Sequence, residues 1–125
     1  MSILSPLEWN EKVRGVIVAQ STSPDLRGRH EISIEHDYCV VTALIWYRNR
    51  KAIEVMFGIG PEAETTASVS APNHGYFTHD AGLSRGTSTS AFEDYCKGGL
   101  AAVKLVDAVM AEMSNHICPI PSGSY

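Results

Sequence analysis

The clearest patterns of apolar and polar positions lie in the first half of the chain. In residues 30–36, isoleucines alternate with charged and hydroxyl residues, which predicts a strand with one solvated face. Residues 39–48 and 51–59 are rich in β-branched and aromatic side chains and meet at the basic segment 48–51, which predicts a hairpin. Because residues 39–47 are apolar on both faces, we expect them to form a central strand.

The N-terminal segment predicts a short helix followed by a strand. Ser5 and Glu8 have the spacing of a capping box, and Pro6 suits the first helical position, so we expect a helix from Pro6 to about Lys12. Residues 15–20 are short and β-branched, which favours a strand. With the three strands above, this predicts a meander of four mainly antiparallel strands.

The middle of the chain is rich in glycine and hydroxyl residues. Residues 60–89 form either a long loop or an extra hairpin, in which 65–71 and 76–79 pair across a turn at 72–75. A loop of this length in a small domain usually has a function or is disordered.

The C-terminal helix has apolar residues on more than one face. We expect Ser90 and Glu93 to form a second capping box at its start. One row of apolar residues recurs at helical spacing and is expected to face the core: Phe92, Cys96, Gly99, Val103, Val106, Met110 and Met113. A second row consists mainly of small residues: Gly98, Ala101, Leu105, Ala108 and Ala111. We expect this second row and the two-faced strand 39–47 to bury a homo-oligomer interface. Residues 115–125 are expected to be a tail.

These elements predict a single α+β domain over residues 1–125. Its sheet would have four to six mainly antiparallel strands, with a short N-terminal helix and a long C-terminal helix packed on one face.

Composition narrows the classes of function. The net charge of −4 and the lack of a long basic run give little support for non-specific nucleic-acid binding. The start lacks the features of a signal peptide, and no apolar run is long enough to cross a membrane. The three widely spaced cysteines indicate a reducing compartment, and we expect Cys39 and Cys96 to be reduced and buried. We therefore expect a bacterial or viral-host cytoplasm.

No catalytic, metal-binding or cofactor-binding residues can be assigned from motifs. Residues 82–86 fit G-x-S-x-G around Ser84, but the helix that should follow the serine begins several residues too late. His36 with Cys39, His74 with His79, and His116 with Cys118 lack the spacing of a structural zinc site. No stretch matches a family motif.

The loop before the C-terminal helix is the candidate binding site. A helix N-terminus presents unpaired N–H groups to an anion, and arginine suits phosphate. Arg85 and residues 87–90 would hold phosphate, while aromatic and imidazole rings would stack on a base. The candidate ligand-binding residues are Tyr76, Phe77, His79, Arg85, Thr87, Ser88, Thr89 and Ser90.

Three functions stay open. The first is a non-enzymatic oligomeric binding protein that captures a phosphorylated or nucleotide-like small molecule. The second is a protein–protein interaction module or inhibitor, such as a phage-encoded anti-defence protein, since many viral accessory proteins are small, acidic and poor in motifs. The third is a small hydrolase that uses Ser84 or a histidine pair.

Overall fold

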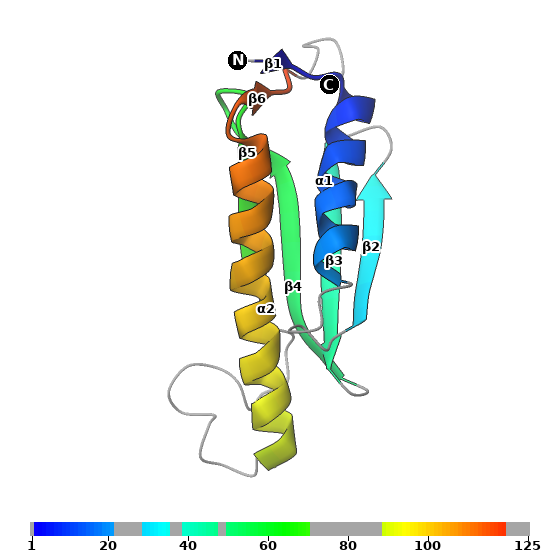
Figure 1. The fold of residues 1–125 in the computed structure, drawn as a ribbon, viewed down its shortest axis with the longest axis vertical. Coiled ribbons are helices and arrows are strands. Elements are labelled where there is room, and N and C mark those ends of the chain that lie inside the picture. The colour runs from blue at the N-terminus through cyan, green and yellow to red at the C-terminus, as the bar shows by residue number, and fades with distance from the viewer. Residues whose placement is uncertain (1, 22–28, 36–38, 48–49, 71–88, 120–125) are drawn as a thin grey trace.

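Two helices lie on one face of a four-stranded antiparallel sheet in the computed structural model (Figure 1). The elements in chain order are β1 (Ser2–Ile3), α1 (Pro6–Ser21), β2 (Arg29–Glu35), β3 (Val40–Tyr47), β4 (Arg50–Ile59), β5 (Thr65–Ser70), α2 (Thr89–Met113) and β6 (His116–Ile117). The structure describes residues 2–21, 29–35, 39–47, 50–70 and 89–119, without the side chains of 29–35, 50–52 and 89–95. The fold is therefore α+β.

The sheet is a meander with the strand order β2-β3-β4-β5. One row across it joins Ile32, Ala43, Val55 and Val69. The strand predicted within 65–71 is present, and its partner is β4. The other half of the predicted hairpin, 76–79, lies outside the described residues.

The N-terminal helix is longer than the sequence analysis predicted. α1 runs from Pro6 to Ser21, so the predicted strand at 15–20 is wrong. Trp9, Val13 and Ile17 recur every four residues, and all three are fully buried. This spacing places one apolar side chain per turn against the sheet, and that packing outweighs the modest helix cost of β-branched residues.

The predicted N-terminal capping box is confirmed. The Glu8 backbone N–H donates to Ser5 Oγ over 3.2 Å, and the Ser5 N–H donates to Glu8 Oε1 over 3.0 Å. The bond from the Ser5 backbone, followed by the Ser5 side chain, lowers the pKa of the Glu8 carboxyl.

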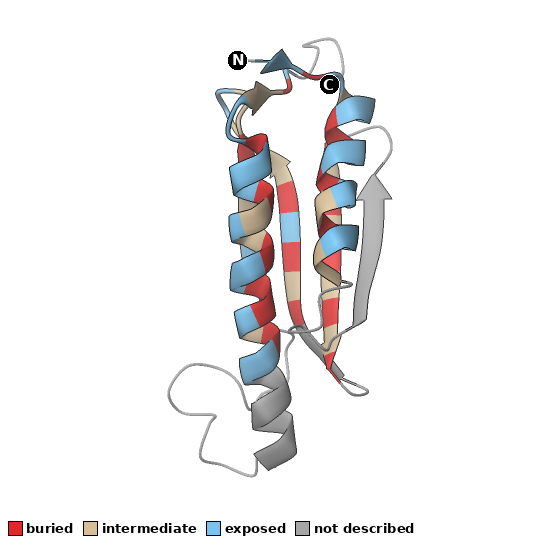
Figure 2. Cartoon of the chain, viewed as in Figure 1, coloured by how far each residue is buried: buried red, intermediate tan, exposed pale blue. Residues whose placement is uncertain are grey.

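α2 packs on the sheet mainly through the row of small residues, although Met113 of the row expected to face the core is also buried. Its buried positions include Gly98, Ala101 and Leu105, whereas Val103 is 58% exposed. Figure 2 shows buried residues along the side of α2 that faces the rest of the molecule and exposed residues along its outer side. The small residues therefore let α2 approach its own sheet and α1. The predicted self-interface at Ala101 is wrong, because Ala101 is fully buried within one chain.

The start of α2 also differs from the prediction. The helix begins at Thr89, so Ser90 lies in its first turn instead of preceding it. The predicted capping role of Ser90 does not fit these bounds, since a capping residue stands just outside the helix.

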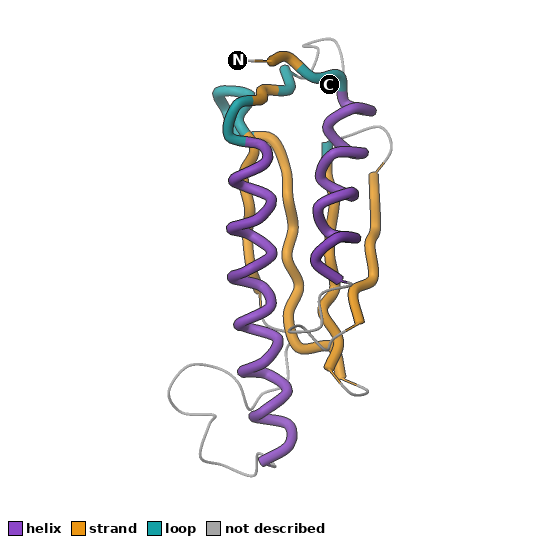
Figure 3. Tube along the Cα trace, in the orientation of Figure 1, coloured by secondary structure: helices purple, strands orange, loops and turns teal. Residues whose placement is uncertain are grey.

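The core lies between the two helices and the inner face of the sheet. On β4, Ile53, Val55 and Phe57 point into it. No helix of the described residues covers the other face of the sheet (Figure 3), and Met56 on that face is 42% exposed. None of the helices in the described ranges is long and apolar enough to cross a membrane.

Candidate functional site

Two of the eight predicted ligand-binding residues belong to the part of the chain that the structure describes. Tyr76, Phe77, His79, Arg85, Thr87 and Ser88 lie outside the described residues. Ser84, His36, His74 and His79, which the serine and metal interpretations need, also lie outside them. Thr89 and Ser90 have a described backbone, and both stand in the first turn of α2.

The first turn of α2 is compatible with the binding of an anion at the helix N-terminus. The turn holds no acidic residue, because the helix begins early enough to leave Glu93 beyond it. The partial positive charge of the helix terminus therefore has no carboxylate within the first turn. This terminus lies at the end of the molecule opposite to β1 and β6 (Figure 1).

The opposite end of the molecule is closed by a small structure that we call the clasp. It consists of the parallel strands β1 and β6 together with the turn 60–64. Ser2 N–H donates to the Asn115 carbonyl over 2.9 Å, and Leu4 N–H donates to the Ile117 carbonyl over 2.8 Å. The Cys118 N–H donates to the Ala63 carbonyl over 2.9 Å, so the turn and the C-terminal segment hold each other.

A pocket of about 210 Å³ adjoins the clasp. Its lining is mostly apolar, and its polar residues are Glu64, Thr65, Ser114 and His116. Nδ1 of His116 is buried and has no hydrogen-bond partner. One Glu64 carboxylate oxygen accepts the Glu62 N–H over 2.8 Å. The volume is below the range of most ligand sites, so the pocket suits water or a very small molecule. The full lining is Glu64, Thr65, Met110, Met113, Ser114, His116 and Ile117.

Two thiols meet beside the clasp. Sγ of Cys39 and Sγ of Cys118 are 3.3 Å apart and both residues are buried, at 3% and 0% exposure. Burial, and then the hydrogen bond with Cys118, raises the pKa of the Cys39 thiol to about 12. No disulfide joins them in this structure, and Cys39 is buried, as expected.

Cys96 was expected to be buried as well, and this expectation is wrong. Its side chain is exposed, because it lies on the side of α2 that faces away from the sheet. Sequence spacing gave no sign that Cys118, in the predicted tail, would be the buried partner of Cys39.

Apolar side chains are exposed along one side of α2, which we call the α2 flank: Leu100, Val103, Val106 and Met110. Leu100 is 54% exposed and Met110 is 36% exposed, while Val106 is half-buried. Met110 and Thr65 line the same pocket, so the flank looks toward β5. Val103, Val106 and Met110 of this row were expected to face the core.

The far side of α2 meets α1. Lys12 Nζ of α1 lies 3.9 Å from Glu112 Oε1 of α2, with both side chains partly exposed. This contact leaves the α2 flank as the side of the helix that has no neighbouring helix in the described chain.

No group of three or more histidine, cysteine or acidic side chains in the described residues could hold a metal ion. The comparisons with known proteins add no template: no family model matches the chain, and no curated protein or solved structure gave a match.

Proposed function

We propose that the protein is a non-enzymatic, homo-oligomeric binding protein, assembled through the α2 flank and the neighbouring edge strand β5. The exposed apolar row on α2 carries this proposal. Val69 on β5 extends it, because Val69 shares the inner sheet face with Val55 and is 52% exposed. Soluble monomers seldom expose contiguous apolar patches of this kind without a partner.

The two edges of the sheet differ in a way that favours a second copy at β5. The outer strand β2 contains Arg29, Glu31 and Glu35, and charges of this kind discourage edge-to-edge pairing. The other edge strand, β5, has the sequence TTASVS without a charge or a proline. An antiparallel copy could therefore continue the sheet at β5.

Charge on α2 suits the same arrangement. Lys104 and Asp107 are exposed, three residues apart, and no ion pair of either is found among the described residues. A two-fold axis perpendicular to α2, as an antiparallel pairing of two β5 strands requires, would place the two α2 helices antiparallel, with Lys104 of each beside the partner's Asp107. Two reciprocal ion pairs would then border the apolar contact.

Val103→Glu tests the assembly. The substitution places an unpaired charge in the proposed interface, which should cost about 2 kcal/mol or more and weaken association roughly thirtyfold. Light scattering at micromolar concentration should show a dimer for the wild type and a monomer for the variant.

Val18→Glu is the matched control, since Val18 is a 43% exposed valine on the other helix and should leave the dimer intact. Lys104→Glu should weaken the dimer, and Lys104→Glu with Asp107→Lys should restore it. A wild type that is monomeric at these concentrations would refute the proposed assembly.

The proposed ligand is a phosphorylated or nucleotide-like small molecule, bound by Arg85 and the first turn of α2. The acid-free first turn supports this choice. Losing a charge-assisted hydrogen bond should cost roughly 1.5–3 kcal/mol, so Arg85→Ala should weaken binding about tenfold to a hundredfold.

A panel of mono-, di- and cyclic nucleotides in a thermal-shift assay tests the ligand. At least one should raise the midpoint of the wild type and have little effect on Arg85→Ala. Arg14→Ala is the control, because Arg14 is an exposed arginine on α1 whose removal should leave the ligand shift unchanged. If no nucleotide shifts the wild type, the ligand assignment is wrong.

The second candidate function is a protein–protein interaction module. The same exposed apolar flank favours it, with another protein in place of the second copy. This function would be favoured over the first if the wild type stays monomeric and no nucleotide of the panel raises its thermal midpoint.

A further inference from the structure

We propose that Cys39 and Cys118 are a site of reversible oxidation, at which a disulfide fastens the C-terminal segment to the start of β3. The proposal is independent of the α2 flank and of any ligand. It is based on the position of the two sulfurs and on how the segments around them are held.

The two sulfur atoms are already close enough to react. Their separation of 3.3 Å must shorten by roughly 1.3 Å to reach the length of a disulfide bond. Small rotations about the side-chain bonds of Cys39 and Cys118 can supply such a movement. Both side chains are enclosed, so solvent does not separate them.

The backbone on both sides of the pair is fixed by other contacts. Cys118 is held by its N–H bond to the Ala63 carbonyl. The Cys39 carbonyl lies 3.7 Å from the position that a Cβ on Gly58 would take, so Cys39 lies close against β4. Neither segment needs to move far for the sulfurs to meet, and oxidation should leave the fold intact.

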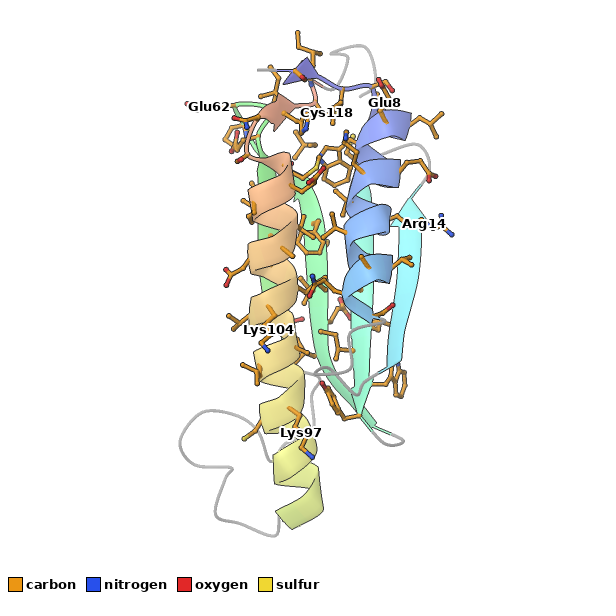
Figure 4. All side chains as sticks on the ribbon, in the orientation of Figure 1. Glu8, Arg14, Glu62, Lys97, Lys104 and Cys118 are labelled. Atoms are coloured by element: carbon orange, nitrogen blue, oxygen red, sulfur yellow. The ribbon has the colours of Figure 1, made fainter. Side chains whose placement is uncertain are left out.

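The third cysteine, Cys96, does not lie close enough to form a disulfide with either Cys39 or Cys118 within the chain. Cys96 is exposed on α2, and Figure 4 places the neighbouring Lys97 far along the helix from Cys118. Cys39 and Cys118 are therefore each other's only close thiol among the described residues.

The oxidant we consider is hydrogen peroxide. One cysteine sulfur attacks a peroxide oxygen, the O–O bond breaks, and a sulfenic acid and one water form. The second sulfur then attacks the sulfenic sulfur, the S–OH bond breaks, and the hydroxyl leaves as a second water. In total the two thiols lose two electrons and two protons, and peroxide is reduced to two waters.

The reaction should be slow and should accelerate with pH. The thiolate is the reactive form, and burial keeps the Cys39 thiol protonated at neutral pH. Such a pair would not act as a fast peroxide sensor. The disulfide would instead form under sustained oxidising conditions.

The decisive experiment uses the full chain with Cys96→Ser, so that the exposed thiol cannot form intermolecular bonds. After peroxide treatment, alkylation under denaturing conditions should find no free thiol where the reduced protein has two. The intact mass should fall by two hydrogen atoms, and a proteolytic digest should contain a peptide that links Cys39 to Cys118. Dithiothreitol should reverse all three changes.

The matched control is Cys96→Ser with Cys118→Ala, which keeps Cys39 alone and should give no such crosslink. The thermal midpoint of the oxidised Cys96→Ser protein should rise and return on reduction. Two alkylatable thiols after prolonged peroxide, or sulfinic acid at either cysteine in place of the crosslink, would overturn the proposal.

Discussion

At the residue scale, the buried polar contacts show how distant segments are held in place. Trp9 is the largest side chain that the core encloses completely. Its indole N–H donates to Oγ1 of Thr65 over 2.9 Å, and both residues are buried. The bond joins α1 to the first residue of β5, so it fixes where the edge strand begins.

Trp9→Phe should show how much this hydrogen bond contributes to the free energy of unfolding. The variant loses the donor and leaves the Thr65 hydroxyl buried without it, which should cost about 1–3 kcal/mol in addition to the lost apolar area. Urea unfolding of Trp9→Phe, Thr65→Val and the double variant forms a double-mutant cycle. The double variant should be more stable than the sum of the single losses predicts, by about 1 kcal/mol. Strictly additive losses would show that the bond contributes nothing.

Glu8 should make the capping box sensitive to acid. Its folded-state pKa lies below the ordinary value of 4.5, because the charged carboxylate accepts the Ser5 N–H. Its contribution to stability is therefore fully present above pH 4.5 and is lost as the pH falls through the lowered folded pKa. The stability difference between the wild type and Glu8→Gln should shrink across that window, measured by urea unfolding at several pH values. A difference that is constant down to the lowest pH would contradict the assignment.

Sequence reasoning at this scale succeeded for local contacts and failed for distant ones. The Ser5–Glu8 pair could be predicted because its spacing and residue types define it. The Trp9–Thr65 bond and the Cys39–Cys118 pair join residues 56 and 79 positions apart. Only the folded chain brings such residues together, and no local pattern specifies it.

At the element scale, α1 shows how composition can conflict with periodicity. The β-branched residues in 15–20 favour a strand, and Gly15 weakens a helix. The buried residues Trp9, Val13 and Ile17 instead follow a four-residue spacing that begins before this segment. Considering the whole span from the capping box onward would have predicted one continuous helix.

Gly15→Ala should stabilise the protein by about 0.5–1 kcal/mol, since alanine loses less entropy than glycine in a helix. Nothing lies within 4 Å of the position that the new Cβ would take. Gly60→Ala is the contrasting variant, because its Cβ would overlap the Glu64 carboxylate and should destabilise the turn. Urea unfolding followed by circular dichroism measures both changes. A loss of stability in Gly15→Ala would contradict the continuous helix.

The face of α2 was assigned wrongly for a physical reason. Large apolar residues are normally the buried ones, so the row with Val103 and Met110 was expected to face the core. Close approach of α2 to the sheet instead requires small residues such as Gly98 and Ala101 at the contact. Val103 and Met110 are left exposed, where the proposed second copy would cover them.

At the scale of the whole molecule, the two helices on one face leave the protein asymmetric. No helix of the described residues covers the outer face of the sheet, and each of the two edge strands, β2 and β5, pairs with one strand only in the described chain. The strand meander from residue 30 onward could be predicted from alternation and turn residues. The pairing of β5 with β4 could not be predicted. β5 follows the turn 60–64, in which Ala63 has a left-handed φ of 64°, and alanine gives no sequence signal for such a conformation.

The parallel arrangement of the clasp has a mechanical consequence. The start of β1 and the end of β6 lie at opposite ends of a parallel pair, so pulling the chain by its two termini shears the pair lengthwise. Shear loads the Ser2–Asn115 and Leu4–Ile117 hydrogen bonds together, whereas an antiparallel pair pulled from adjacent ends would open one bond at a time. In the oxidised protein, the disulfide would prevent the chain between Cys39 and Cys118 from extending. These residues are 79 positions apart, which corresponds to roughly 270 Å of contour length. Single-molecule force spectroscopy would therefore distinguish the reduced from the oxidised protein by the contour length that each releases on unfolding.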